Sequence, residues 1–155
     1  MLPETAKEKI SSGAADAFIK EVLGIPDPSL QDYKDRLIRA VDSFCALYGS
    51  DRDVSVFSVG GRSEISGNHT DHNGGKVIAA AVNLDIISVA AARADGVIKV
   101  KSEGHREDVV TPDDTSSPDP SRYFHSSSLI AGICHAFRAR GYNVGGFDAY
   151  TTSNE

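Results

Sequence analysis

The stretch VSVFSVGGRSEISGNHTDHNGG, residues 54–75, changes abruptly from an apolar to a polar pattern. The β-branched and aromatic residues of 54–59 predict a strand that runs into Gly60, Gly61 and Arg62. Residues 60–75 then combine five glycines with an Arg, a Glu, two His, an Asp and two Asn. Carboxylate and amide oxygens accept hydrogen bonds from hydroxyl groups, and Arg, His and Asn donate them. Since glycine lets the backbone approach a ligand closely, the stretch predicts a polyol-binding site. The alternative interpretation is a hydrogen-bonded surface loop.

Helical patterns precede this stretch. Apolar residues spaced four apart predict an amphipathic helix over 6–23, with Ile10, Ala14, Phe18 and Val22 on its apolar face. A longer stripe predicts a second helix that follows Ser29 and ends at Gly49. The stripe consists of Tyr33, Leu37, Val41, Phe44 and Tyr48.

Strand signals dominate after the polar stretch. Residues 77–81 and 86–92 predict buried strands, and Asn83 and Asp85 interrupt the apolar run between them. Asp95-Gly96 predicts a hairpin that leads into a strand over 97–101. A short strand at 109–110, a surface loop at 112–120, a helix ended by Gly141 and a last strand at 146–151 complete the pattern. The residues expected to face the core from that helix are Leu129, Ile130, Ile133, Cys134 and Phe137.

Composition narrows the class of protein. The 155 residues are 40% hydrophobic, which is typical of one folded domain rather than a disordered tail. No apolar run reaches the roughly 18 residues that a membrane-spanning helix needs. A net charge of −6 without a basic stripe argues against nucleic acid as a partner. We expect neither a nucleic acid nor a membrane partner, and no secretory signal is visible at the start.

Two further patterns carry less chemistry. Cys45 and Cys134 lie on apolar helical faces without a CxxC spacing, so we expect buried thiols in a reducing cytosol. His69, Asp71 and His72 could suggest a metal site, but zinc needs three or four ligands of matching geometry. The other histidines have no useful spacing, so we expect no metal ligands in this chain.

Residues 60–75 resemble the galactokinase signature, whose usual form is Gly-Arg-x-Asn-x-Ile-Gly-Glu-His-Thr-Asp-Tyr-Asn-Gly. Gly61-Arg62, Gly67, His69-Thr70-Asp71 and Asn73-Gly74 match it in register. The resemblance extends over about residues 53–155, because 77–87 and 140–149 are similar to later segments of the family. It implies an α+β fold, the N-terminal domain of the GHMP kinase superfamily, with a mixed β-sheet backed by helices. Residues 1–50 would form an N-terminal helical extension and residues 51–155 the kinase N-terminal domain.

The resemblance also implies an activity, the transfer of the γ-phosphoryl group of ATP to the anomeric hydroxyl of galactose, with Mg²⁺, in the cytoplasm. Arg62 would be catalytic, because a guanidinium stabilises charge on the transferred phosphoryl group. The residues that would bind the sugar are Asn68, His69, Thr70, Asp71, Asn73 and Gly74. The oligomeric state is not readable from the sequence.

Departures from the signature leave alternatives open. Asn68 stands where the family usually has Glu, so it keeps an acceptor oxygen but loses a charge. Glu64, Ser66 and His72 differ as well. The alternatives are a kinase of a related sugar, such as N-acetylgalactosamine or arabinose, and a galactokinase-like sugar sensor without turnover.

The family's ATP loop, Gly-Leu-Ser-Ser-Ser-Ala, has no counterpart in these 155 residues. Ser126-Ser127-Ser128 lacks the preceding glycines and falls in an earlier helix, so ordinary first-turn serines are the better interpretation. The end at Glu155, straight after a predicted strand, is expected to be a cut made before this loop. The family's catalytic Asp and magnesium ligands would lie further on. We therefore expect the sugar-binding half of a kinase, inactive by itself.

Overall fold

The computed structural model describes residues 1–67, 70–111, 114 and 120–154. Its α-helices are α1 (Pro3–Ser11), α2 (Asp16–Glu21), α3 (Leu30–Tyr48) and α4 (Ser126–Ala139). Its strands are β1 (Ser55–Ser66), β2 (Ile78–Arg93), β3 (Ile98–Ser102), β4 (Glu107–Val110) and β5 (Gly146–Ser153). Short 3₁₀ turns lie at Asp27–Ser29, Asp71–Asn73 and Pro120–Arg122.

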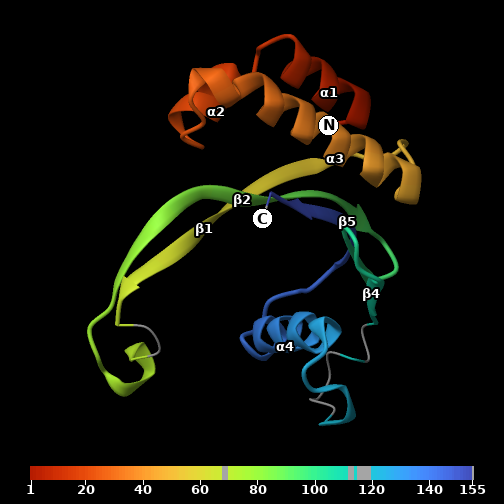
Figure 1. The fold of residues 1–155 in the computed structure, drawn as a ribbon. Coiled ribbons are helices and arrows are strands. Elements are labelled where there is room, and N and C mark those ends of the chain that lie inside the picture. Colours follow the sequence, from red (N-terminus) through yellow and green to blue (C-terminus); the bar gives the residue numbers. More distant parts are fainter. Residues whose placement is uncertain (68–69, 112–113, 115–119, 155) are drawn as a thin grey trace.

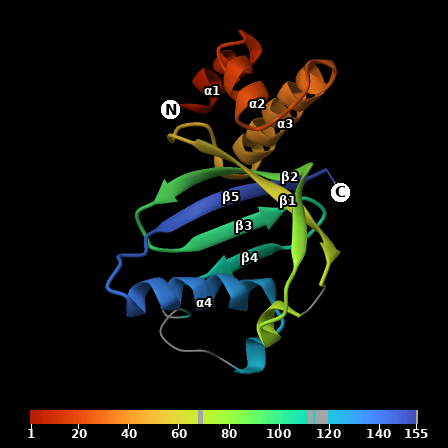
Figure 2. The ribbon, with the colours of Figure 1, turned by 90° about the vertical axis from the view of Figure 1, so that its left-hand side faces the viewer.

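The strands form one mixed sheet in the order β1-β2-β5-β3-β4. Neighbours are antiparallel except β3 and β5, which run parallel. Helices α1–α3 cover one face of the sheet, and α4 lies on the opposite side near β4 (Figures 1 and 2). The predicted α+β class with a mixed sheet backed by helices is confirmed.

Helix α3 is the main packing partner of the sheet. Four of the five predicted stripe residues are buried, with Val41 and Phe44 fully so, and Tyr48 packs partly buried beside them. They meet Ile87 and Val89 of β2, which are also fully buried. Gly49 ends the helix at φ +86°, a conformation that favours glycine. This core contains residues from both sides of residue 50. The predicted division into an N-terminal helical extension (1–50) and a kinase N-terminal domain (51–155) therefore stays a prediction.

The single helix predicted over 6–23 is wrong. Gly13 adopts φ +85° and separates α1 from α2, so the four-residue spacing does not continue on one face. Ile10 is buried as expected, but Phe18 and Val22 are exposed, and Ile19 is the residue of α2 that enters the core. Local spacing therefore missed a change in helix direction.

Strands β1 and β2 are longer than predicted. β1 continues from residue 59 to Ser66, and the two expected strands at 77–81 and 86–92 form one strand, β2. The buried residues of β2 all lie in its second half. The first half pairs with the end of β1 away from the helices (Figure 1), so residues 77–81 are not the buried strand that we expected.

The hairpin predicted at Asp95-Gly96 is also wrong. Although the chain turns there, with Gly96 at φ +74°, β5 lies between β2 and β3 and pairs with both. At the entry to β5, a Cβ on Gly146 would lie 2.4 Å from the carbonyl oxygen of Val97. Glycine at 146 therefore permits the start of β5 to pass close to the backbone of residue 97, where β5 enters between β2 and β3.

Helix α4 buries a narrower face than predicted. Cys134 is buried against Ile98 and Val110, with Ile130 partly buried beside them. Leu129, Ile133 and Phe137 are exposed, which corrects the expectation that they face the core. Cys45 and Cys134 are both free thiols. Among the helices of the described residues, none is at once long and apolar enough to cross a bilayer.

Candidate functional site

The polar stretch closes a tight loop at the tip of the β1–β2 hairpin. The backbone N–H and hydroxyl of Thr70 both donate to the Gly67 carbonyl, at 3.1 and 2.7 Å. The Thr70 carbonyl accepts in turn from the N–H groups of Asn73 (3.1 Å) and Gly75 (2.8 Å). Thr70 therefore organises the loop through hydrogen bonds to three of its residues.

Glycine is required at two positions of this loop. Gly67 has φ +86°, and a Cβ there would lie 2.3 Å from the Lys76 carbonyl oxygen. A Cβ on Gly75 would lie 2.6 Å from the Cβ of Thr70. Such distances are too short for side chains, so the glycines permit the close crossing of the loop's two ends.

The structure describes some of the predicted site residues but not all of them. Arg62 lies on β1, Thr70 precedes the 3₁₀ turn Asp71–Asn73, and Gly74 follows that turn at φ +74°. Asn68 and His69 lie outside the described residues, and for Asp71 only the backbone is described. Their predicted contacts with a sugar stay predictions.

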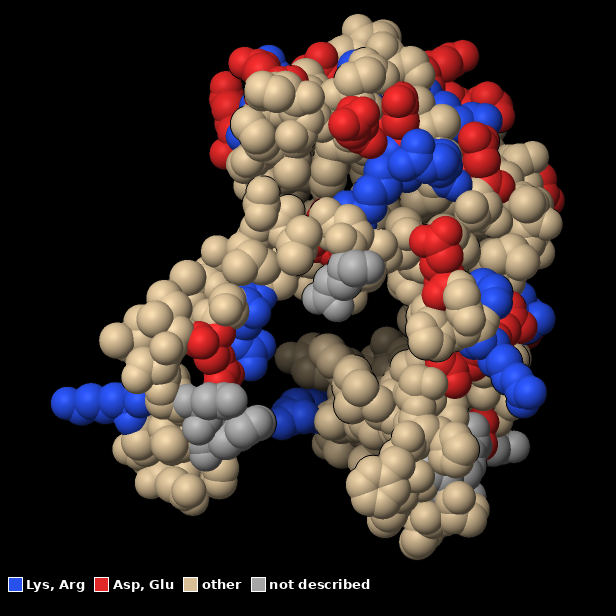
Figure 3. Space-filling view, in the orientation of Figure 1, with Lys and Arg blue, Asp and Glu red and all other residues tan. Residues whose placement is uncertain are grey.

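The side chain of Arg62 is exposed and makes a long ion-pair contact. Its guanidinium lies 3.6 Å from the carboxylate of Glu64, two residues along β1 and on the same face. The residues opposite them on β2, Ala81 and Ala79, are small. An exposed ion pair of this length contributes little stability, so the guanidinium is available to another anion. Figure 3 shows a hollow between this hairpin and the part of the molecule that carries α4.

Asp85 of β2 is the centre of a polar cluster that the sequence shows only as an interruption of an apolar run. Its Oδ2 accepts from the hydroxyls of Tyr33 (2.6 Å) and Ser58 (2.5 Å), and its Oδ1 from the Arg36 guanidinium. Arg36 also donates to the Asp85 backbone carbonyl at 2.8 Å. The cluster therefore ties α3 to β1 and β2.

Burial alone would raise the pKa of Asp85, but hydrogen bonds from Ser58, Tyr33 and Arg36 together lower it. Burial and the hydrogen bond to Asp85 raise the pKa of Tyr33 to about 12. The cluster thus favours an ionised carboxylate beside a neutral phenol.

Alkaline titration tests the state of this phenol. A tyrosine in the unfolded chain has a pKa of about 10, below that of folded Tyr33. Its stabilising contribution is therefore complete below pH 10 and falls as the pH rises towards 12. We expect the free energy of unfolding, measured with urea, to fall between pH 10 and pH 12. The fall should be smaller in Tyr33→Phe. An unchanged pH dependence in Tyr33→Phe would contradict the raised pKa.

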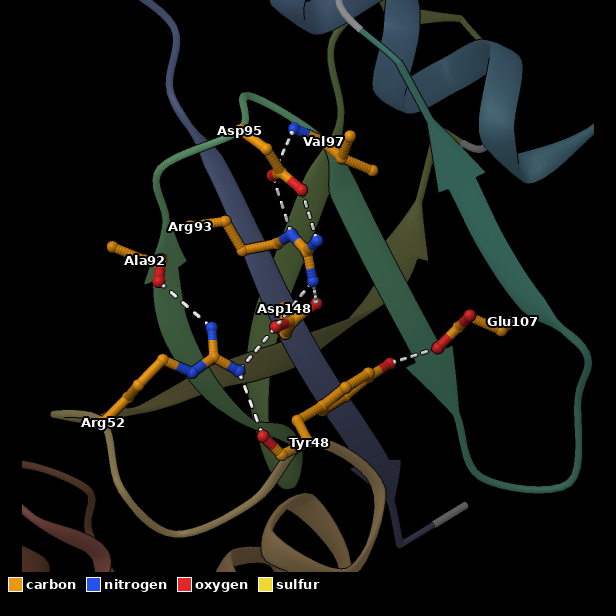
Figure 4. Close-up of polar contacts among 8 residues, drawn as sticks. All are labelled: Tyr48, Arg52, Ala92, Arg93, Asp95, Val97, Glu107 and Asp148. Atoms are coloured by element: carbon orange, nitrogen blue, oxygen red, sulfur yellow. Dashed lines mark hydrogen bonds and ion pairs between the residues drawn. The ribbon is translucent and has the colours of Figure 1, made fainter.

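A second cluster surrounds Asp148 of β5 (Figure 4). This carboxylate is 1% exposed and accepts from Arg52 at 2.6 Å and from Arg93 at 2.9 Å. Arg52 also donates to the carbonyls of Tyr48 and Ala92, both at 3.2 Å, so the cluster joins α3 to β2 and β5. No motif or spacing pointed to it.

Comparisons with known proteins agree on one family. The model of the galactokinase galactose-binding signature matches residues 42–92, which include the end of α3, β1, the loop and nearly all of β2. A galactokinase of Bacillus subtilis is 30% identical over 115 residues, 72% of this chain. One from Lactococcus lactis is 27% identical over 66% of the chain.

The chain is a distant homologue of galactokinases. The crystal structure of Lactococcus lactis galactokinase complexed with galactose matches 74% of it with a TM-score of 0.62 and 24% identity, which supports the same fold. The chain spans 29% of the length of the Bacillus subtilis relative and 26% of the Lactococcus lactis one.

The described residues of this galactokinase homologue contain no group of three or more His, Cys, Asp or Glu side chains able to hold a metal ion. At the N-terminus of α4, Ser126 donates to the carboxylate of Asp108 at 2.6 Å. Since this acid already lies beside the first turn, it disfavours a phosphate there. Ser126 thus lies in the first turn of α4 with an acidic partner, and its interpretation as an ordinary first-turn serine stays a prediction.

Proposed function

We propose that this chain supplies the galactose-binding part of a galactokinase-type sugar kinase. The observation that carries the proposal is the signature match over residues 42–92, centred on a loop that glycines and Thr70 hold in a compact form. The sugar would lie against the loop, its hydroxyl groups donating to the Asp71 carboxylate. It would also exchange hydrogen bonds with Asn68, His69, Thr70, Asn73 and Gly74.

The intact kinase would transfer the γ-phosphoryl group of ATP to the anomeric hydroxyl of galactose in the cytoplasm. Arg62 would be the catalytic residue from this chain, stabilising negative charge on the transferred group. Its exposed guanidinium and long contact with Glu64 support this role. ATP and Mg²⁺ would be bound mainly by residues outside residues 1–155, with residues 51–155 contributing the N-terminal domain.

Titration with sugars tests the proposal directly. We expect galactose to shift the amide signals of Gly61, Gly67 and Gly75 in a saturable way. Glucose, which differs at one hydroxyl, should bind about tenfold more weakly or worse, because one misplaced hydrogen bond costs about 1–3 kcal/mol. Arg62→Ala serves as the matched control, since it should retain galactose binding. No saturable shift with galactose would contradict the proposal.

The same titration tests the sugar preference. Tighter binding of N-acetylgalactosamine or arabinose would support a related sugar as the ligand. A sugar sensor would bind galactose equally well, so it is distinguished by the absence of galactose phosphorylation in the intact protein. The 155-residue chain itself is expected to bind sugar without consuming ATP, and galactose-dependent ADP release by it would contradict that expectation.

A further inference from the structure

The ladder between β1 and β2 shifts register at two places, between Glu64 and Ser66 near the loop and between Gly60 and Arg62 nearer the body of the sheet. Regular pairs run from Ser55↔Ala90 to Gly60↔Asp85, and the next pair is Arg62↔Ala81. Residues 82–84 thus bulge opposite Gly61, whose Cβ would lie 3.2 Å from the Val82 side chain. Such a bulge bends a hairpin and weakens its ladder locally.

Beyond the bulge, the hairpin extends away from α1–α3 (Figure 1). We call residues 62–66 and 78–81 the distal hairpin; it carries Arg62 and leads into the loop. Its large apolar residues are exposed, Ile65 by 68% and Ile78 by 61%, whereas Ile87 of the same β2 strand is fully buried. Since the distal hairpin has little core of its own, its direction is set where it joins the sheet.

Asp85 lies at the last regular pair before the bulge, and its side chain is 9% exposed. The carboxylate joins α3 to β1 through Tyr33 and Ser58, as described above. Its backbone N–H donates to Asn154 at 3.0 Å, and Arg36 reaches the Thr152 carbonyl at 3.3 Å. Groups from α3, β1, β5 and the segment after β5 therefore converge on this residue.

We propose that Asp85 is a positioning residue that holds the base of the distal hairpin and thereby places Arg62 and the sugar-binding loop. The part of this inference that concerns sugar rests on the proposed function. Without the Asp85 carboxylate, the hairpin would pivot at the bulge beside Gly61. Galactose would then have to order the hairpin on binding, and the lost conformational entropy would weaken its affinity.

Hydrogen exchange in the full 155-residue chain tests the positioning role. Asp85→Asn keeps the side-chain shape but removes the charge that Arg36 and the two hydroxyls contact. We expect the amides of the distal hairpin to exchange about tenfold faster, while those of 87–91 and 147–152 change much less. Galactose affinity should fall about tenfold in parallel.

Asp148→Asn is the matched control, because Asp148 is also a buried carboxylate between α3 and the sheet but lies away from the bulge. At equal global stability, set with urea, its distal hairpin should exchange as in the unmodified chain. Tyr33→Phe removes one bond to Asp85 and provides a milder variant if Asp85→Asn does not fold.

Equal exchange in the distal hairpins of the two Asn variants at matched stability would overturn the proposal. A looser hairpin with unchanged galactose affinity would overturn the role in sugar binding. If the unmodified chain binds no sugar, the proposed function fails, and the exchange rates alone still decide whether Asp85 anchors the hairpin.

Discussion

Replacing Asp148 with Asn is expected to lower the free energy of unfolding by about 3 kcal/mol, because it breaks two ion pairs to a buried carboxylate and leaves Arg52 without its counter-charge. Arg52 and Arg93 both contact this carboxylate, which is 1% exposed. Equilibrium unfolding in urea measures the change. The loss should be visible as an earlier midpoint with an unchanged slope, since the native fold is retained.

Asp95→Asn is the control for this prediction, because Asp95 binds the same Arg93 at the surface. Hydrogen bonds from Arg93 and the Val97 N–H lower the pKa of Asp95 to about 2. Water can replace these contacts, so the unfolding midpoint should change much less than in Asp148→Asn. Equal effects of the two variants would contradict the importance of burial for the Asp148 cluster.

Patterns that repeat within one element were predictable from the sequence. The stripe of α3 places an apolar residue on one face at every turn, and the structure buries that face against the sheet. The β-branched and aromatic residues of 54–59 likewise predicted the start of β1. In both cases the information lies within about twenty consecutive residues.

Features that depend on distant partners were not predictable in the same way. Asp95-Gly96 has the composition of a hairpin turn, but strand β5, some fifty residues later, takes the place between β2 and β3. Asp85 and Asp148 look like interruptions of apolar strands until α3 brings Arg36 to the first and the segment after α3 brings Arg52 to the second. A charged residue within an otherwise apolar strand is the one local signal that could have pointed to these clusters.

The candidate site likewise has features that were predictable from the sequence and features that were not. Its position between two strands and its polar composition were visible in residues 60–75, and the signature match includes them. The continuation of β1 to Ser66 was not, because Ser63, Glu64 and Ser66 are polar residues in an exposed hairpin rather than a buried strand. Exposed strand ends lack the apolar alternation on which strand prediction depends.

Gly67→Ala is expected to reduce galactose binding about 30-fold. Alanine at φ +86° costs about 1–2 kcal/mol of backbone strain, and its Cβ would lie 2.3 Å from the Lys76 carbonyl oxygen and 2.9 Å from the Cα of Val77. Both of those atoms belong to the backbone, so the loop must open to accommodate the methyl group. About 2 kcal/mol corresponds to the 30-fold loss, and isothermal titration with galactose measures it.

Gly104→Ala provides the matched control for this loop. Gly104 has φ +74°, so alanine meets the same kind of backbone strain, but no atom lies within 4 Å of its Cβ position. It lies between β3 and β4, away from the signature. We expect Gly104→Ala to lose stability through the same backbone strain as Gly67→Ala and to leave galactose binding unchanged. If both variants bind equally well, the close crossing at Gly67 does not shape the site; if both bind poorly, global stability rather than loop geometry controls binding.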